Sequence, residues 1–193
     1  MIVFLDGNFI AKNPAFVWMD VNGIGYEVNI SLYTYSKIQD LQKGRLLTYL
    51  QVKEDGFSLF GFHDEDERQL FMQLISVSGI GASTARMMLS SMKTEEITQA
   101  IVSEDEKSLE RIKGIGAKSA KRLILELKDK LLKGKPGGQI SVVMHNNTDQ
   151  DALNALVSLG IARQAAIQAL EKVNKLLPNA GLEEKIKSAL KQI

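Results

Sequence analysis

The sequence predicts an α+β protein of several domains: an N-terminal β-barrel, a helical region, a linker and a C-terminal three-helix domain. Three observations support this prediction. Short β-prone segments fill residues 1–63, a helical period of apolar residues begins after Phe62, and a glycine-rich stretch separates this region from three further short helices. The 193 residues are enough for two or three small domains.

The barrel is predicted over residues 1–63. Asn22-Gly23 is a turn signal between two β-prone segments, and the stretch from Leu32 to Gly44 is long enough for a short helix. Trp18 lies among apolar strand residues and is expected in the core. Four or five strands with one helical insertion favour an OB-like Greek key, and periodicity alone leaves an SH3-like barrel open. The expected strands lie at 15–21, around 26–30, at 46–52 and at 57–62.

Residues 64–133 are predicted to form a second domain that is almost entirely helical. Two glycine breaks interrupt it, Gly79-Ile80-Gly81 and Gly114-Ile115-Gly116, and they are copies of each other. Over eleven residues from the first glycine, five positions are identical and four are close substitutions, at an offset of 35 residues. A single break of this kind is usually only a tight turn, whereas a duplicated one indicates a shared function.

A Gly-apolar-Gly turn followed at once by a helix suits phosphate binding. Glycine removes side chains where another backbone must approach, and the free N–H groups and positive dipole end of the helix attract anions. We expect the middle isoleucines to be buried between the helices. The candidate DNA-binding residues are Gly79, Ile80, Gly81, Ser83, Arg86, Gly114, Ile115, Gly116, Lys118, Lys121 and Arg122.

The charge distribution is uneven along the chain and gives residues 107–133 a strong basic excess. The chain carries a net charge of +1, but residues 107–133 hold nine basic and three acidic groups, whereas residues 64–106 hold three and nine. A block of this kind is a local footprint for a polyanion even in a neutral chain. The acidic groups at 95–96 and 104–106 are expected in helix caps or on solvated faces rather than as metal ligands.

Several other classes of function are disfavoured. A dinucleotide site is not expected, because Thr84 stands where its third glycine belongs and a helix precedes the motif. There is no phosphate-binding loop of a nucleotide-driven motor. Without cysteine, and with only His63 and His145, no metal or other cofactor is expected. The absence of a signal peptide and of a long apolar run predicts a cytoplasmic protein with no membrane contact.

Residues 134–148 are predicted to be a flexible linker, since they hold glycines, a proline and Asn146-Asn147. Residues 149–193 then form three short helices, which make a small UBA-like domain. A small domain on a tether suits docking to a partner, because the tether raises the effective concentration.

The paired breaks resemble a tandem helix-hairpin-helix unit of DNA repair and recombination proteins. Across essentially all 193 residues, the chain resembles the RuvA family, the Holliday-junction-binding subunits of bacterial branch-migration complexes. The strings that carry this resemblance are Gly61-Phe62 with Glu67-Arg68-Gln69-Leu70-Phe71, Val77-Ser78-Gly79-Ile80-Gly81, and the eleven residues from Gly114 to Ile124.

The resemblance implies a non-catalytic DNA-binding subunit that acts in recombination, repair and the SOS response to DNA damage. A flat homotetramer would hold a four-way junction in an open planar form, with Glu54 and Asp55 as an acidic pin at its centre. Residues 149–193 would engage a hexameric AAA+ ATPase of the RuvB type, and a junction resolvase is a further candidate partner. The alternatives are a general helix-hairpin-helix adaptor for duplex DNA and, with less support, a DNA glycosylase or lyase.

Ser83 departs from the family pattern, which often has a basic residue at this position, as Lys118 is in the second copy. A hydroxyl can donate a hydrogen bond but brings no charge. We therefore expect the second hairpin to bind phosphate more tightly, with Arg86 partly compensating in the first.

Overall fold

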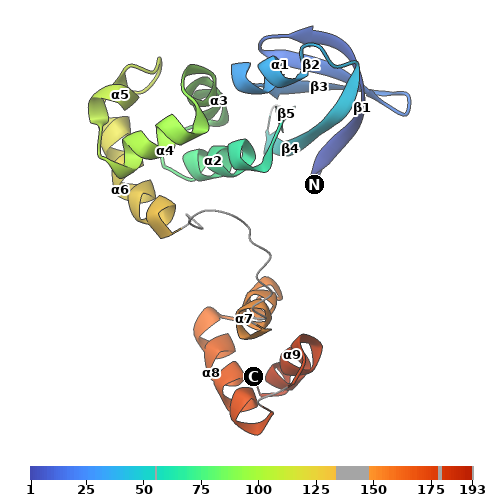
Figure 1. Cartoon of the computed structure of the whole chain (residues 1–193), viewed down its shortest axis with the longest axis vertical. Coiled ribbons are helices and arrows are strands. Elements are labelled where there is room, and N and C mark those ends of the chain that lie inside the picture. The colour runs from blue at the N-terminus through green and yellow to red at the C-terminus, as the bar shows by residue number, and fades with distance from the viewer. Residues whose placement is uncertain (55, 134–147, 178–179, 193) are drawn as a thin grey trace. The chain divides into compact units, whose positions relative to one another are not determined.

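The computed structural model describes residues 1–54, 56–133, 148–177 and 180–192 (Figure 1). The chain divides into two compact units, with the division after Gly137. Among the described residues, the first unit contains two clusters of buried apolar side chains and the second contains one, and each unit is described by itself.

The first unit begins with a closed five-stranded barrel in the order β1-β2-β3-β5-β4. Neighbouring strands are antiparallel except β3 and β5, which pair in parallel at Asn29–Phe60 and Ile30–Gly61. A parallel pair needs a crossover connection, and this one contains α1 (Leu32–Ile38) and β4. The OB-like prediction is confirmed. The strands are β1 (Phe4–Asn13), β2 (Phe16–Val21), β3 (Ile24–Ile30), β4 (Lys43–Lys53) and β5 (Gly56–Phe62).

Alternation along β2 decides which side chains enter the barrel. Val17 and Met19 are fully buried, so Trp18 between them points outward and is 48% exposed. Its Nε1 donates a hydrogen bond to Glu27 Oε2 at 2.9 Å on the neighbouring strand. The expectation that Trp18 belongs to the core is therefore wrong, because an apolar run in a half-exposed strand still has a period of two.

Five helices complete the first unit and pack around a core that they share with the barrel. Phe71 of α2 lies 5.3 Å from Phe60 and 4.8 Å from Phe62 between ring centroids, so the aromatic rings of β5 pack directly on the helical region. This shared core makes the barrel and the helices one compact unit. The helices are α2 (Glu65–Ile75), α3 (Ala82–Ser91), α4 (Thr94–Val102), α5 (Glu106–Glu110) and α6 (Ala117–Lys133).

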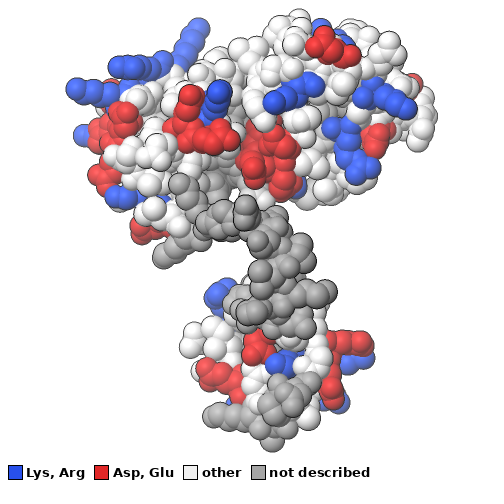
Figure 2. All heavy atoms as spheres, in the orientation of Figure 1, with Lys and Arg blue, Asp and Glu red and all other residues white. Residues whose placement is uncertain are grey.

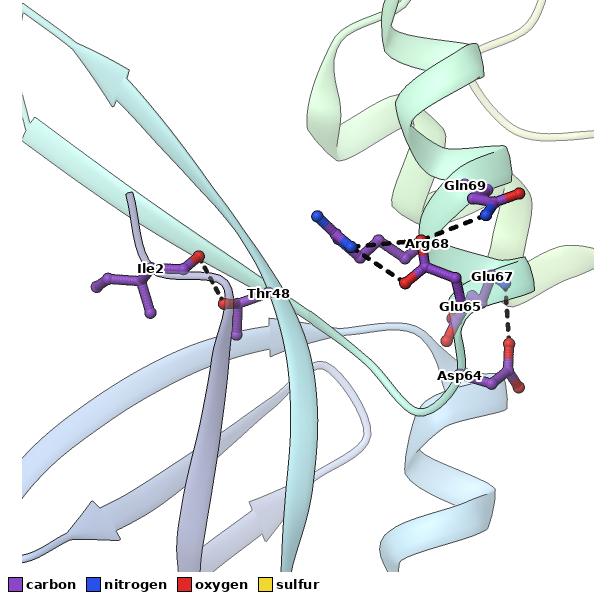
Figure 3. Close-up of polar contacts among 7 residues, drawn as sticks. All are labelled: Ile2, Thr48, Asp64, Glu65, Glu67, Arg68 and Gln69. Carbon is purple, nitrogen blue, oxygen red and sulfur yellow. Dashed lines mark hydrogen bonds and ion pairs between the residues drawn. The ribbon is translucent and has the colours of Figure 1, made fainter. Parts of the chain in front are cut away.

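Polar contacts at the start of α2 fix the entry into the helical region (Figure 3). Asp64 is the N-cap, and its Oδ1 accepts a hydrogen bond from the Glu67 backbone N–H at 2.9 Å. Glu65 and Arg68 form an ion pair at 3.0 Å on the exposed side. Figure 3 also shows Thr48 Oγ1 of β4 donating to the Ile2 carbonyl at 2.8 Å, a bond that ties the N-terminal segment to the barrel.

Glu67 is a buried carboxylate at the contact between α2 and the barrel. It accepts hydrogen bonds from the hydroxyls of Ser31 and Thr34, which flank the start of α1, and from the His63 backbone N–H. Burial raises the pKa of Glu67, and these three donors oppose that increase by stabilising the ionised form. The network attaches α1 of the barrel to the first helix of the helical region.

The second unit is a bundle of α7 (Thr148–Ser158), α8 (Arg163–Leu176) and α9 (Leu182–Leu190). Its core contains small and aliphatic side chains such as Leu156, Ala166 and Val173. Lys185 is buried and pairs with Asp149, which also accepts a hydrogen bond from Asn174 Nδ2 at 2.9 Å. The predicted linker lies outside the described residues except for Thr148, which begins α7.

Candidate nucleic-acid interface

The two glycine turns have the same backbone geometry. Gly79 and Gly114 have φ of +92° and +94°, in the left-handed region that favours glycine. The N–H of the following isoleucine donates to the carbonyl three residues before it, at 3.0 Å in both copies. One turn further, the first bond of each following helix, from residue 85 to 81 and from residue 120 to 116, measures 2.9 Å in both.

The middle isoleucine fixes each turn to the protein interior. Ile80 is 4% exposed and Ile115 is 5% exposed, and both belong to the core of the first unit. The expected burial of these side chains is confirmed. Because they anchor in one core, the two hairpins are parts of one rigid region, and we name them hairpin 1 (residues 79–86) and hairpin 2 (residues 114–122).

The second glycine of each turn faces open space. Apart from the adjoining backbone, no protein atom would lie within 4 Å of a methyl group placed on Gly81 or Gly116. Gly81 is the N-cap of α3 and makes no side-chain capping bond, and α6 begins directly after Gly116. Backbone N–H groups at these helix starts can therefore meet an approaching phosphate.

The cations of hairpin 2 are partly available. Lys118 is exposed in the first turn of α6, and Lys121 is exposed with its Nζ 3.9 Å from Glu106 Oε2. Arg122 instead donates from Nη1 to the Ser78 carbonyl at 3.0 Å, just before hairpin 1. Its Nε lies 3.7 Å from Glu126 Oε1 in the next turn of α6. Arg122 thus connects the two hairpins as well as contributing charge.

The cation of hairpin 1 has a different environment. Arg86 is partly buried and donates from Nη1 to the Ala15 carbonyl at 2.9 Å and to Asn29 Oδ1 at 2.8 Å, both in the barrel. Burial lowers the pKa of the Arg86 guanidinium below its ordinary value. Ser83 is exposed near the turn. The structure therefore brings Ser83 to the surface of hairpin 1 and directs Arg86 toward the barrel.

Lys113 is a candidate that the sequence reasoning missed. It is exposed and directly precedes Gly114, where the first copy has Ser78. Extending the repeat alignment by one residue toward the N-terminus would have revealed it. Its position adds a third lysine to the surface of hairpin 2.

The acidic side chains are distributed differently from the basic ones, although Glu106 and Glu104 lie beside Lys121 and Lys128 of α6. In Figure 2, basic side chains gather over the end of the unit that carries α5, whereas acidic side chains cover α4 and the start of α2. Glu96 accepts the Lys93 backbone N–H at 2.9 Å, and Asp105 accepts the Ser108 N–H at 3.1 Å, so both are caps as expected. The Ser108 hydrogen bonds hold the pKa of Asp105 below its usual range.

The pin residues are only partly described. Glu54 is exposed in the turn between β4 and β5, whereas Asp55 lies outside the described residues. Within the described ranges, no group of three or more histidine, aspartate and glutamate side chains is placed to hold a metal ion. Among the helices that the structure describes, none has the length and apolar character needed to cross a bilayer.

Two equivalent hairpins in one core, joined to an OB-like barrel, define a protein of the tandem helix-hairpin-helix class. Three family models match the chain. The model of the RuvA N terminal domain matches residues 1–61, and that of the SAM-like helix-hairpin-helix tandem matches residues 71–129. The model of the RuvA C-terminal domain matches residues 149–193. The chain belongs to the RuvA family.

Similar proteins cover the whole chain. A protein of Christiangramia forsetii is 49% identical over 193 residues, and one of Flavobacterium psychrophilum is 44% identical over 193 residues, with both chains fully covered in each comparison. A protein of Cytophaga hutchinsonii is 44% identical over 197 residues, with 99% of each chain covered. All three are named Holliday junction branch migration complex subunit RuvA.

Proposed function

We propose that this chain is the junction-binding subunit of a branch-migration complex in DNA recombination and repair. It holds four-way junctions in an open planar form as a homotetramer and recruits a RuvB-type AAA+ ATPase. The subunit itself is non-catalytic and acts in the cytoplasm. The names of the similar proteins support the complex, and the paired hairpins of this chain support the DNA contact.

The observation that carries this proposal is the equality of the two hairpins. Both offer a left-handed glycine, a buried isoleucine and an uncovered second glycine at a helix start. Two such turns in one core suit successive phosphates of one duplex arm. Contacts to phosphate position a protein without reading base sequence, which is what binding to junctions of any sequence requires.

The barrel contributes the centre of the complex in this proposal. Glu54 lies at the end of the β4–β5 hairpin, and Asp55 follows it in the sequence. Carboxylates repel phosphates, so four such turns at the crossover would oppose stacking of the arms. The pin-bearing barrel is assigned to residues 1–63, the DNA-binding region to 64–133, the linker to 134–148 and the docking domain to 149–193.

In this proposal, exposed apolar side chains of the second unit contact the ATPase. Leu159, Leu182 and Leu190 are exposed around the helix ends of this small bundle. Exposed apolar side chains of this kind suit a protein partner. Leu159→Glu should abolish stimulation of branch migration by the added ATPase while leaving junction binding intact. Unchanged stimulation would remove Leu159 from the docking surface.

The test of the proposed function is a gel-shift titration at about 0.1 M salt with magnesium and excess competitor duplex. An immobile four-way junction is compared with a linear duplex of equal arm sequence. We expect at least 100-fold tighter junction binding in a discrete band, a threshold below the roughly 10³-fold at which the usual range for specific complexes begins. Equal binding to both DNAs would leave only a general duplex adaptor.

A further inference from the structure

Arg86 occupies the position of the repeat that corresponds to Lys121, but the two side chains have different partners. Both Arg86 hydrogen bonds run to the barrel, to the Ala15 carbonyl at the β1–β2 turn and to Asn29 in β3. Lys121 is 67% exposed and has Glu106 as its partner, at 3.9 Å. Equivalent positions in the two copies therefore contact different parts of the protein.

A second contact holds the same helix to the barrel one turn later. Ser90 Oγ donates to the Arg86 carbonyl at 2.8 Å and accepts the Leu32 backbone N–H, at the start of α1, at 3.1 Å. Because residues four apart lie on one side of a helix, Arg86 and Ser90 attach the same side of α3. Two attachment points fix the orientation of the helix better than one.

Asn29 extends the contact to the strand that carries the pin turn. Its Nδ2 donates to the Leu59 carbonyl of β5 at 3.3 Å, while its Oδ1 accepts from Arg86. The strand β5 begins at Gly56, directly after the turn that contains Glu54. A chain of hydrogen bonds thus runs from the helix of hairpin 1 to the strand that follows this turn.

We propose that Arg86 is a positioning residue that fastens hairpin 1 to the barrel, and that hairpin 1 binds phosphate through backbone N–H groups and the Ser83 hydroxyl without a side-chain cation. The proposal deepens the proposed function and rests on it. A junction engages the barrel turn and the hairpins at once, so the placement of one relative to the other determines affinity. A single duplex arm engages only the hairpins, and their contacts do not depend on the barrel.

Salt dependence separates a positioning residue from a phosphate ligand. Each phosphate neutralised by a cation contributes about 0.9 to the slope of log affinity against log salt. We expect Arg86→Met to leave the slope for duplex binding unchanged. It should lower the preference for junction over duplex by at least about tenfold, because it removes two charge-assisted hydrogen bonds. The matched control, Lys121→Met, should lower the duplex slope by about 0.9.

Two further variants test the geometry rather than the charge. Asn29→Leu removes the acceptor but keeps the Arg86 charge, and it should reproduce the loss of junction preference. Both bonds leave from Nη1, and the lysine ammonium is one bond closer to the backbone than this atom. Arg86→Lys therefore keeps a cation but should not restore the preference. The double variant Arg86→Met with Asn29→Leu should lose less than the sum of the two single losses.

The opposite pattern would overturn the proposal. If Arg86→Met lowers the duplex slope by about 0.9 and Asn29→Leu keeps the junction preference, Arg86 is a phosphate ligand. If the unaltered protein shows no junction preference, the proposed function fails instead. The contact between Arg86 and Asn29 is then tested by thermal unfolding. Additive changes in stability from Arg86→Met and Asn29→Leu would refute the proposed contact. If Arg86→Met does not fold, Asn29→Leu still tests the attachment of hairpin 1 to the barrel.

Discussion

Hairpin 1 and hairpin 2 share their backbone conformation but differ in the charged side chains that they expose. The glycine φ angles differ by 2°, and the isoleucines are equally buried in the same core. Yet Lys118 and Lys121 of hairpin 2 are exposed, whereas hairpin 1 presents Ser83 and directs Arg86 to the barrel. The two copies therefore share the features that the fold requires, while the neighbours of each copy determine which partners its side chains contact.

The largest expected effect is on stability, and it tests the buried isoleucine that each hairpin has. Ile80→Ala and Ile115→Ala should each lower the free energy of unfolding by about 3 kcal/mol, because each leaves a cavity in the same core. Chemical denaturation measures both, and Leu125→Ala, at a position 84% exposed in α6, is the control with little expected change. A difference of more than about 2 kcal/mol between the two isoleucine variants would show that the anchors are not equivalent.

The next largest effect is on the salt dependence of DNA binding, and it tests the charges in which the two hairpins differ. Lys118→Ala should lower the salt slope of DNA binding by about 0.9 for each subunit bound, because one phosphate contact is lost. Ser83→Ala should leave the slope unchanged, and Ser83→Lys should raise it by a similar amount and tighten binding at low salt. Titrations at several salt concentrations measure these slopes. An equal response to Lys118→Ala and Ser83→Ala would contradict the proposed asymmetry.

The smallest expected effect is a pH dependence of stability that arises from Glu67, which precedes both hairpins in the sequence. The folded pKa of Glu67 is raised, so the folded state holds this proton more tightly than the unfolded chain. The stability that Glu67 contributes is present below the unfolded pKa of about 4.3 and is lost as the pH rises through the folded value. Asp64, close by, adds to the raised pKa by charge repulsion.

Glu67→Gln, which cannot ionise, is the reference for this effect. The unfolding free energy of the unaltered protein minus that of Glu67→Gln should decrease as the pH rises from about 4 toward neutral. Denaturation curves at a series of pH values measure the difference, and an increase with pH would reverse the sign and refute the argument. The relative contributions of the two hairpins to DNA binding should not change, since α2 supports both.

Much of the fold was predictable because its signals are local. Turn residues and alternation gave four of the five strands and the OB-like class, and glycine breaks located the helices of residues 64–133. The strand Phe4–Asn13 was missed, because Asp6, Gly7 and Asn8 interrupt its apolar pattern. That strand pairs with β2 on one side and β4 on the other, so partners distant in the sequence stabilise it.

Predictions for single side chains succeeded where the cause was local and failed where it was not. The burial of Ile80 and Ile115 follows from the repeat itself. The outward direction of Trp18 depends on which face of β2 closes the barrel, and an apolar run does not contain that information. The cap roles of Glu96 and Asp105 follow from their positions, since Glu96 is the third residue of α4 and Asp105 directly precedes α5.

Two equivalent glycine turns on a barrel-and-helix scaffold could be predicted from the sequence alone, since turns and helix starts depend on neighbouring residues. Only the tertiary structure decided which cations remain available to DNA. Arg86 meets Asn29 and Ala15, which lie 57 and 71 residues away in the chain. The repeat alignment equates Arg86 with Lys121, but the barrel packs against α3, and a guanidinium beside two acceptors binds them in preference to solvent.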